Sequence, residues 1–150
     1  MNQEVALNKL KHICSGQEKS PADIMALLRK WDVPEDDRQQ ILQSLKDEKY
    51  LDETRFAIAY TSDKIRFDHW GLVKIRLMLQ QKGISNETIE EAFNEIDRSE
   101  YRSMIGHEIS KKRKSVKGAP YEIWAKLARY GASRGYAFDD MREFLGDQGE

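Results

Sequence analysis

The residues of this sequence with the most obvious chemistry form a dense run of cations in its last third. They are Lys111, Lys112, Arg113, Lys114 and Lys117. Clustered ammonium and guanidinium groups bind the phosphates of nucleic acids, and they also bind acidic protein surfaces. Lysines are common at the end of a helix in any case, because they interact favourably with the helix dipole. The run therefore predicts a binding surface, with either kind of partner open.

The positive charge extends beyond the run itself. Residues 98–134 carry 10 basic and 3 acidic side chains, a net charge of +7, whereas the whole chain has a net charge of −1. Arg129 and Arg134 belong to this surplus, so both are included in the candidate binding surface. Aromatic residues that could stack on bases lie in the same region. They are Tyr121, Tyr130 and Tyr136.

A second, weaker candidate surface lies near the middle of the chain. It consists of Arg66, Lys74 and Arg76. Because Lys74 and Arg76 are two residues apart, they would point to different sides of a helix. We expect Arg55 to pair with an acidic neighbour. Trp31 and Trp124 lie on apolar stripes, and we expect both in the core.

Residues suited to catalysis or metal binding are scattered. His12, His69 and His107 have no metal-ligand spacing. His12 and Cys14 lie about 200° apart around a helix, so they cannot form a local cysteine–histidine pair. The sequence contains no phosphate-binding loop, nucleophile elbow or dinucleotide-binding glycine motif. We therefore expect no enzymatic activity, no catalytic or metal-binding residue and no cofactor.

The overall composition indicates a soluble protein of the reducing cytoplasm. The one cysteine, Cys14, excludes an internal disulfide framework and a paired-cysteine zinc site. No apolar run approaches the roughly 18–20 residues that a membrane-spanning helix needs. Residues 1–4 do not begin a signal peptide, because no cationic start is followed by an apolar run. We expect no contact with a membrane.

Helices must position these side chains. Val and Thr together number only 7 of 150 residues, which argues against sheets. Apolar residues recur instead at helical spacing, as in Ile24, Leu28 and Trp31. The pattern predicts about nine helices and no convincing strand. Residues suited to begin helices are Ser20, Asp52, Ser99 and Pro120.

The helices form an internal repeat. A shift of 51 residues places Ile24 on Ile75, and a shift of 52 places Ile75 on Leu127. The same turn recurs at matching positions as Trp31-Asp32-Val33, Lys82-Gly83-Ile84 and Arg134-Gly135-Tyr136. Units this small bury their apolar stripes only by stacking on a neighbour. The sequence predicts an all-α fold, three tandem three-helix repeats stacked into an elongated, curved molecule, with repeats at 1–51, 52–97 and 98–150.

The middle repeat carries a resemblance to a known family. Its segments match, in order, a helix start of the form L-D-D-x-R-F-A, with Glu53 in place of the second Asp, a G-x-x-x-I-x-x-x-L helix and a K/R-G-I turn. The matching residues are Leu51-Asp52-Glu53-Thr54-Arg55-Phe56-Ala57, Gly71-Leu72-Val73-Lys74-Ile75, Leu79-Gln80-Gln81-Lys82-Gly83-Ile84 and Ile89-Glu90-Glu91-Ala92. On these residues the chain resembles the RecX family of regulators of the RecA recombinase, which also has three three-helix repeats.

The resemblance implies a regulator that works by binding. Such proteins lie along the groove of the RecA filament on single-stranded DNA and inhibit its recombinase, ATPase and co-protease activities, which modulates DNA repair and the SOS response. The implied partner is the RecA filament, with single-stranded DNA contacted indirectly or weakly. We expect the protein to be a monomer, and the basic residues named above are its candidate partner-binding residues.

Two alternatives belong to other classes. A helical protein could bind duplex DNA through a helix-turn-helix motif, whose recognition helix enters the major groove. The expected helix over residues 87–96 disfavours this, because it carries four acidic residues. They are Glu87, Glu90, Glu91 and Glu95. The chain could also be a protein-interaction scaffold unrelated to RecA.

Overall fold

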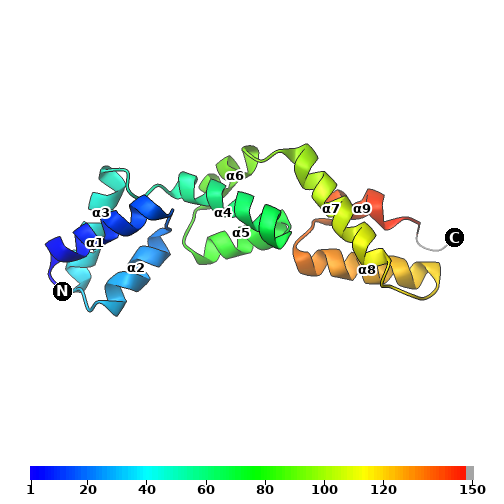
Figure 1. The fold of residues 1–150 in the computed structure, drawn as a ribbon, viewed down its shortest axis with the longest axis horizontal. Coiled ribbons are helices and arrows are strands. Elements are labelled where there is room, and N and C mark those ends of the chain that lie inside the picture. Colours follow the sequence, from blue (N-terminus) through cyan, green and yellow to red (C-terminus); the bar gives the residue numbers. More distant parts are fainter. Residues whose placement is uncertain (148–150) are drawn as a thin grey trace. The chain divides into compact units, whose positions relative to one another are not determined.

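The structure of the chain is a computed structural model that describes residues 1–147, which fold into helices joined by short turns (Figure 1). The helices are α1 (Gln3–Gly16), α2 (Pro21–Lys30), α3 (Glu35–Asp47), α4 (Glu53–Asp68), α5 (Leu72–Gln81), α6 (Asn86–Asn94), α7 (Arg98–Arg113), α8 (Pro120–Arg134) and α9 (Phe138–Leu145). No strand occurs within residues 1–147. The prediction of an all-α fold with about nine helices is confirmed.

Most helices begin where their capping residues predict. Ser20 and Asp23 form a capping box at the start of α2: the Ser20 hydroxyl accepts from Asp23 N at 3.1 Å, and the Asp23 carboxylate accepts from Ser20 N at 3.0 Å. Asp52 caps α4 by accepting a hydrogen bond from Arg55 N at 2.9 Å. Pro120 is the first residue of α8, where its missing N–H has no consequence.

The start of α7 differs from the prediction. Ser99 does not cap this helix; Asp97 does, and its carboxylate accepts hydrogen bonds from Ser99 N at 3.0 Å and Glu100 N at 3.1 Å. The carboxylate of Asp97 reaches the free N–H groups of the first turn, so the helix begins before Ser99.

The chain divides into two compact units, which we describe separately. The first consists of residues 1–60 and 79–94, and the second of residues 61–78 with the described chain from residue 95 onward. In the first unit, α1 and α2 pack against α3; in the second, α7, α8 and α9 pack against one another. A buried core of the first unit contains Ala6, Leu10, Cys14, Ile24, Leu28, Val33, Ile41, Leu45 and Leu51. The predicted repeat boundaries after residues 51 and 97 stay a prediction.

The tryptophans lie at the edges of the cores. Trp31 and Trp124, predicted as core residues, are both partly buried, and Trp31 packs against the core of the first unit. Lys9 Nζ lies 5.1 Å from the Trp31 ring centroid, and the rings of Trp124 and Phe138 pack edge to face with centroids 6.1 Å apart. A side chain of this size is seldom completely buried, even on an apolar stripe.

The three turns singled out by the sequence repeat share one backbone geometry. Asp32, Gly83 and Gly135 have φ angles of 55°, 83° and 93°. In each turn the following N–H donates to a carbonyl five residues earlier, which defines a Schellman motif. These bonds are Val33 N to Leu28 O (3.0 Å), Ile84 N to Leu79 O (3.1 Å) and Tyr136 N to Gly131 O (2.9 Å). The apolar residue after each turn is buried, so the repeat extends to backbone geometry and packing.

Asp32 occupies the left-handed position that glycine occupies in the other two turns. This backbone costs most residues other than glycine about 1–2 kcal/mol, and Asp32 follows the C-terminal end of α2, where the helix dipole disfavours negative charge. We expect Asp32→Gly to increase the free energy of unfolding by about 0.5–1 kcal/mol. Urea unfolding followed by circular dichroism measures the change, and a lower midpoint would show that the turn does not limit stability.

Asp23 also joins α2 to the turn after α5. Lys82 Nζ lies 3.1 Å from the Asp23 carboxylate. Burial by itself raises the pKa of Asp23, but the hydrogen bonds from Ser20 and Lys82 and the Lys82 charge outweigh it and hold the pKa below its ordinary 3.8. Because the folded pKa is lowered, the ionised carboxylate stabilises the fold above the unfolded pKa. This contribution is lost as the pH falls through the folded pKa.

We expect Asp23→Asn to decrease the free energy of unfolding by about 1 kcal/mol at pH 7, because it weakens the cap and removes the ion pair. The difference between the two proteins should begin to shrink below about pH 3.8, the ordinary pKa of the group, and should fall further as the pH passes the lowered folded pKa, where the folded wild-type carboxyl becomes protonated as well. Urea midpoints of both proteins at pH 7 and at low pH test this. An equal difference at both pH values would mean that the Asp23 charge contributes nothing.

The second unit contains a close backbone contact between the start of α5 and the end of α8. Gly71 N donates to Arg134 O at 2.7 Å, and Val73 N donates to Gly135 O at 3.0 Å. Free N–H groups at one helix start thus pair with carbonyls at another helix end. A Cβ on Gly71 would lie 2.2 Å from the Gly135 carbonyl carbon. Only glycine at position 71 permits this approach.

Two buried tyrosines complete the contact. Tyr101 OH accepts from Leu72 N at 2.9 Å, and burial raises the pKa of Tyr101 to about 12. Tyr136 OH donates to His69 O at 2.7 Å, and burial raises the pKa of Tyr136 well above its ordinary value of 10.0. Both phenols therefore stay protonated at neutral pH, and residues 69–73, Tyr101 of α7 and the end of α8 form one hydrogen-bonded block within the second unit.

Candidate functional site

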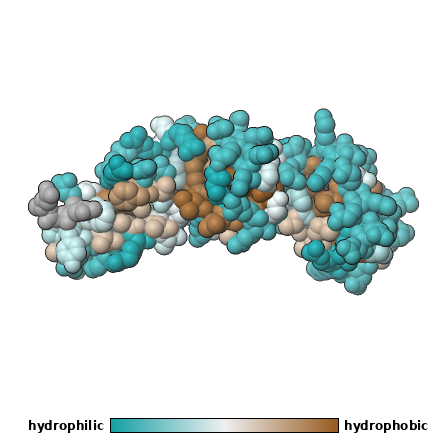
Figure 2. Space-filling model, turned by 180° about the vertical axis from the view of Figure 1, so that it is seen from behind, coloured by the Kyte–Doolittle hydropathy of each residue, from teal (hydrophilic) through white to brown (hydrophobic). Residues whose placement is uncertain are grey.

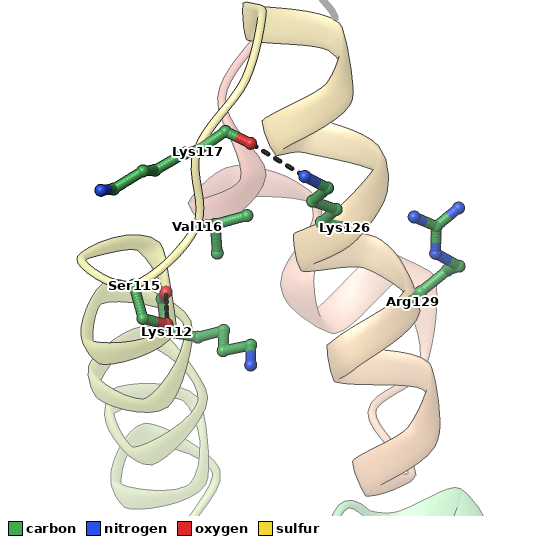
Figure 3. Close-up of a pocket in the computed structure, with 6 residues that line it drawn as sticks. All are labelled: Lys112, Ser115, Val116, Lys117, Lys126 and Arg129. Atoms are coloured by element: carbon green, nitrogen blue, oxygen red, sulfur yellow. Dashed lines mark hydrogen bonds between the residues drawn. The ribbon is translucent and has the colours of Figure 1, made fainter.

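A basic pocket lies between the end of α7 and α8 (Figure 3). Its volume is about 320 Å³. Among residues 1–147 no acidic side chain lines it, so the described lining is positively charged. We call it the basic pocket, and its lining residues are Lys112, Ser115, Val116, Lys117, Lys126 and Arg129.

Local hydrogen bonds shape the basic pocket. Lys126 Nζ donates to Lys117 O at 2.8 Å, which holds the loop after α7 against α8 (Figure 3). Lys112 Nζ points into the space between the two helices and lies 5.2 Å from the Tyr130 ring centroid. The Lys117 side chain points away from the other cations (Figure 3). The ammonium groups of Lys112 and Lys126 therefore lie between the two helices, whereas the Arg129 side chain extends from the opposite edge of α8 in this view (Figure 3).

The local sequence explains how these cations come together. Lys112 lies in the last turn of α7, where a cation interacts favourably with the helix dipole. The chain then turns through residues 114–119 and Pro120 begins α8. Lys126 and Arg129 are three residues apart and share one side of α8.

The residues of the predicted basic run differ in what they contact in the structure. Lys111 and Lys114 are exposed at the end of α7 but do not line the basic pocket. Arg113 Nη2 donates to Phe144 O at 2.6 Å, so its guanidinium ties α7 to α9. Of that run, only Lys112 and Lys117 line the basic pocket, together with the separately predicted Arg129.

Arg134 contributes to structure inside the second unit. Its Nη2 lies 3.9 Å from the carboxylate of Glu108, which is buried. Its guanidinium carbon lies 5.6 Å from the Tyr130 ring centroid. His69 Nε2 lies 3.6 Å from the same Glu108 carboxylate. These contacts partly compensate a buried negative charge, which is costly to leave unpaired.

The expectation that three tyrosines could stack on bases is wrong for Tyr136. For Tyr130, neighbouring side chains limit the access of a base to the ring. Tyr136 is buried, since the apolar position after the turn belongs to the core. Tyr130 is partly buried, with Lys112 and Arg134 against its ring and its hydroxyl 3.4 Å from Glu108. Tyr121, which is 62% exposed, is the one left open to solvent among the three.

The second candidate surface does not join the basic pocket. Arg66 Nε lies 3.4 Å from the Glu100 carboxylate, and Lys74 Nζ lies 4.3 Å from the Trp70 ring centroid. Arg76 lies on α5 and is partly buried. As predicted, Arg55 pairs with an acid: its Nε donates to the Glu18 carboxylate at 2.8 Å.

Lys126 is the functional candidate that sequence reasoning missed. Lys126 belongs to the charge surplus of residues 98–134, but it is not a predicted binding residue, because no basic residue lies next to it in the sequence. Its spacing of three residues from Arg129 was the available signal, since residues i and i+3 of a helix are neighbours. Its proximity to Lys117 depends on how the loop packs on α8.

Residues 1–147 were compared with the requirements of a metal site, a reactive cysteine and a membrane-spanning helix. Within this range no three His, Cys, Asp or Glu side chains gather in a way that could hold a metal ion. Cys14 is buried, and burial raises the pKa of its thiol above 9.0, which disfavours the reactive thiolate. Within residues 1–147, no helix has both the length and the hydrophobicity that a membrane span requires.

Curated relatives are similar in sequence to this protein over most of the chain. The "Regulatory protein RecX" of Clostridium tetani is 30% identical over 110 residues, covering 71% of this chain and 50% of that protein. The protein of the same name from Salmonella arizonae is 30% identical over 112 residues, covering 75% of this chain and 66% of that protein. The chain thus spans about half to two thirds of the length of these relatives.

Solved structures and family models agree with this similarity. A crystal structure of regulatory protein RecX has a TM-score of 0.85 at 22% identity and covers 95% of this chain and 72% of its own. That of RecX from Lactobacillus salivarius has a TM-score of 0.81 at 19% identity, with 95% and 94% covered, which shows the shared fold. The models for the second and third RecX three-helix domains match residues 52–92 and 106–145, more than half of the chain. The chain therefore belongs to the RecX family.

Proposed function

We propose that this protein is a non-enzymatic regulator of RecA that binds the RecA filament on single-stranded DNA and inhibits its recombinase, ATPase and co-protease activities. The observation that carries this proposal is membership of the RecX family, whose curated relatives are named regulatory proteins. In this role the protein is a cytoplasmic monomer that modulates DNA repair and the SOS response.

The basic pocket supplies a physical basis for filament binding. A filament on single-stranded DNA presents phosphates and the acidic groups of its protein, and both attract cations. In the part of the chain that the structure describes, Lys112, Lys126 and Arg129 line the pocket with cations from two helices, and no acidic side chain lines it. Lys111 and Lys114 extend the positive surface at the end of α7. We propose that this region makes the salt-sensitive part of the contact.

Recognition of duplex DNA through a helix-turn-helix motif has less support than binding to the RecA filament. A recognition helix needs donors and cations on its outer face to approach the major groove. In α6 (Asn86–Asn94), the exposed residues include Glu87, Glu90 and Glu91. Three carboxylates on a helix of this length would repel the DNA backbone.

A pull-down with three baits tests the proposal. The baits are RecA alone, RecA assembled on single-stranded DNA, and duplex DNA without RecA. We expect retention on the RecA filament and little on duplex DNA. Retention on duplex DNA alone would favour the helix-turn-helix alternative, and retention on none of the three would contradict regulation through RecA.

A further inference from the structure

The second unit exposes large hydrophobic side chains on α4 and α5. Phe67 is 76% exposed, Val73 49% and Leu77 55%. Single exposed hydrophobics are ordinary, but three within eleven residues of one another indicate a binding surface. Figure 2 shows hydrophobic surface gathered around the middle elements of the chain, in the region of α4 and α5.

The position of Val73 and Leu77 on α5 is fixed by helix geometry. They are four residues apart and therefore neighbours on one side of the helix. Ile75, between them, is completely buried and points about 160° away from each of them. Lys74 and Arg76 lie between them in the sequence, and around the helix axis they lie on either side of the stripe formed by Val73 and Leu77. The outer side of α5 thus presents two aliphatic side chains between two cations.

Trp70 joins the outer side of α5 to α4. Its ring centroid lies 4.6 Å from Lys64 Nζ and 4.3 Å from Lys74 Nζ. Phe67 follows Lys64 by three residues, and Leu77 follows Lys74 by three residues, so each pair shares a side of its helix. We call this set, joined through the Trp70 ring, the α4–α5 surface. Its residues are Lys64, Phe67, Trp70, Val73, Lys74 and Leu77.

The backbone beneath this surface is held in place. Val73 N donates to Gly135 O at 3.0 Å, and Gly71 N donates to Arg134 O at 2.7 Å. The exposed side chain of Val73 therefore sits on a fixed helix start rather than on a loose segment. A preorganised surface loses little conformational freedom when it binds.

We infer that the α4–α5 surface docks on an apolar, acid-bearing surface of a protein partner. Lys64 pairs with Asp68 at 3.1 Å and Arg66 with Glu100 at 3.4 Å. Charge complementarity with the ammonium group of Lys74, which lies beside the exposed Val73 and Leu77, identifies the partner class. Aliphatic side chains such as Val73 and Leu77 gain by burial against protein but cannot stack on bases. The Trp70 ring is already approached by two ammonium groups, which makes it a poor platform for a base.

This inference rests on the proposed function and assigns a second contact to it. The basic pocket of α7 and α8 would bind through charge, whereas the α4–α5 surface would bind the protein part of the filament mainly by burying apolar side chains. The two contacts differ in their dependence on salt, because screening weakens charge interactions far more than apolar burial.

The test uses the full chain with Val73→Gln and Leu77→Gln together. Glutamine keeps helix propensity while removing the aliphatic surface. Val5→Gln is the matched control, since Val5 is an aliphatic residue of α1 that is 46% exposed. Binding is measured by fluorescence anisotropy at several salt concentrations, with RecA filaments on a labelled single-stranded oligonucleotide and with the bare oligonucleotide. Circular dichroism verifies folding; if the double variant unfolds, Leu77→Gln alone replaces it.

We expect the double variant to bind filaments at least about tenfold more weakly, with an unchanged salt slope and unchanged binding to the bare oligonucleotide. Val5→Gln should bind like the wild type. Wild-type affinity of the double variant for filaments would overturn the inference, as would a matching loss on bare oligonucleotide, which would indicate a nucleic-acid contact. Absence of wild-type binding to filaments would instead overturn the proposed function on which the inference rests.

Discussion

Replacing Gly135 with alanine is expected to decrease the free energy of unfolding of the second unit by about 3–5 kcal/mol. Gly135 has a φ angle of 93°, which alanine adopts only at a cost of about 1–2 kcal/mol. The added Cβ would also lie 2.4 Å from Lys74 Cβ. Relieving this overlap moves α5 away from α8 and breaks the bond from Val73 N to Gly135 O.

Two further glycine variants separate strain from steric overlap. Gly83 has a similar φ of 83°, but a Cβ there meets nothing within 4 Å, so Gly83→Ala should cost only about 1–2 kcal/mol. Gly71→Ala adds a Cβ 2.2 Å from the Gly135 carbonyl carbon without a positive φ, so it should cost about as much as Gly135→Ala.

Urea unfolding with Trp70 and Trp124 fluorescence, in a Trp31→Phe background, measures Gly135→Ala and Gly71→Ala in the second unit, to which both reporters belong. Gly83 lies in the first unit, so Gly83→Ala is measured with Trp31 fluorescence in a Trp70→Phe, Trp124→Phe background. Equal losses for Gly83→Ala and Gly135→Ala would mean that the backbone contact between α5 and α8 contributes no stability.

Reversing the charge of Lys112, Lys126 and Arg129 together is expected to weaken binding to the RecA filament by about 10- to 100-fold at moderate salt. If each cation contacts one phosphate of single-stranded DNA, the slope of log K against log salt should decrease in magnitude by about 2. A titration of the filament at several salt concentrations measures both quantities. Arg113 is left unchanged, because it bonds to Phe144 O and supports α9.

A matched variant with the same change in net charge is Arg29→Glu, Lys30→Glu and Lys49→Glu. These three residues are exposed in the first unit. We expect this variant to retain most of the affinity and the full salt slope. Equal weakening by both triple variants would indicate that binding responds to net charge and that the basic pocket has no special role.

Helices and repeated turns could be predicted from the sequence because their causes are local. The apolar spacing of Ile24 and Leu28 and the cap at Ser20 act within a few residues, and the left-handed turn at Gly83 needs only a residue that tolerates positive φ. Ser99 was misassigned as a cap because the competition was decided by another local side chain, the carboxylate of Asp97.

The contacts between helices could not be predicted in this way. Gly71 and Gly135 touch although 64 residues separate them, and a lone glycine gives no sign of its neighbour. The basic pocket was partly predicted from the density of lysines, but the approach of Lys126 to Lys117 O depends on the packing of a loop on α8. Arg113 and Arg134 were predicted as binding residues by charge alone, and their protein contacts became visible only in the fold.

The ATPase rate of RecA on single-stranded DNA, measured with increasing amounts of this protein, tests the central claim most directly. Regulation through the filament predicts a concentration-dependent decrease in ATP hydrolysis. It also predicts that the Lys112→Glu, Lys126→Glu and Arg129→Glu triple variant needs about tenfold more protein for the same decrease. An unchanged rate in large excess of folded wild-type protein would contradict the claim that this chain inhibits RecA.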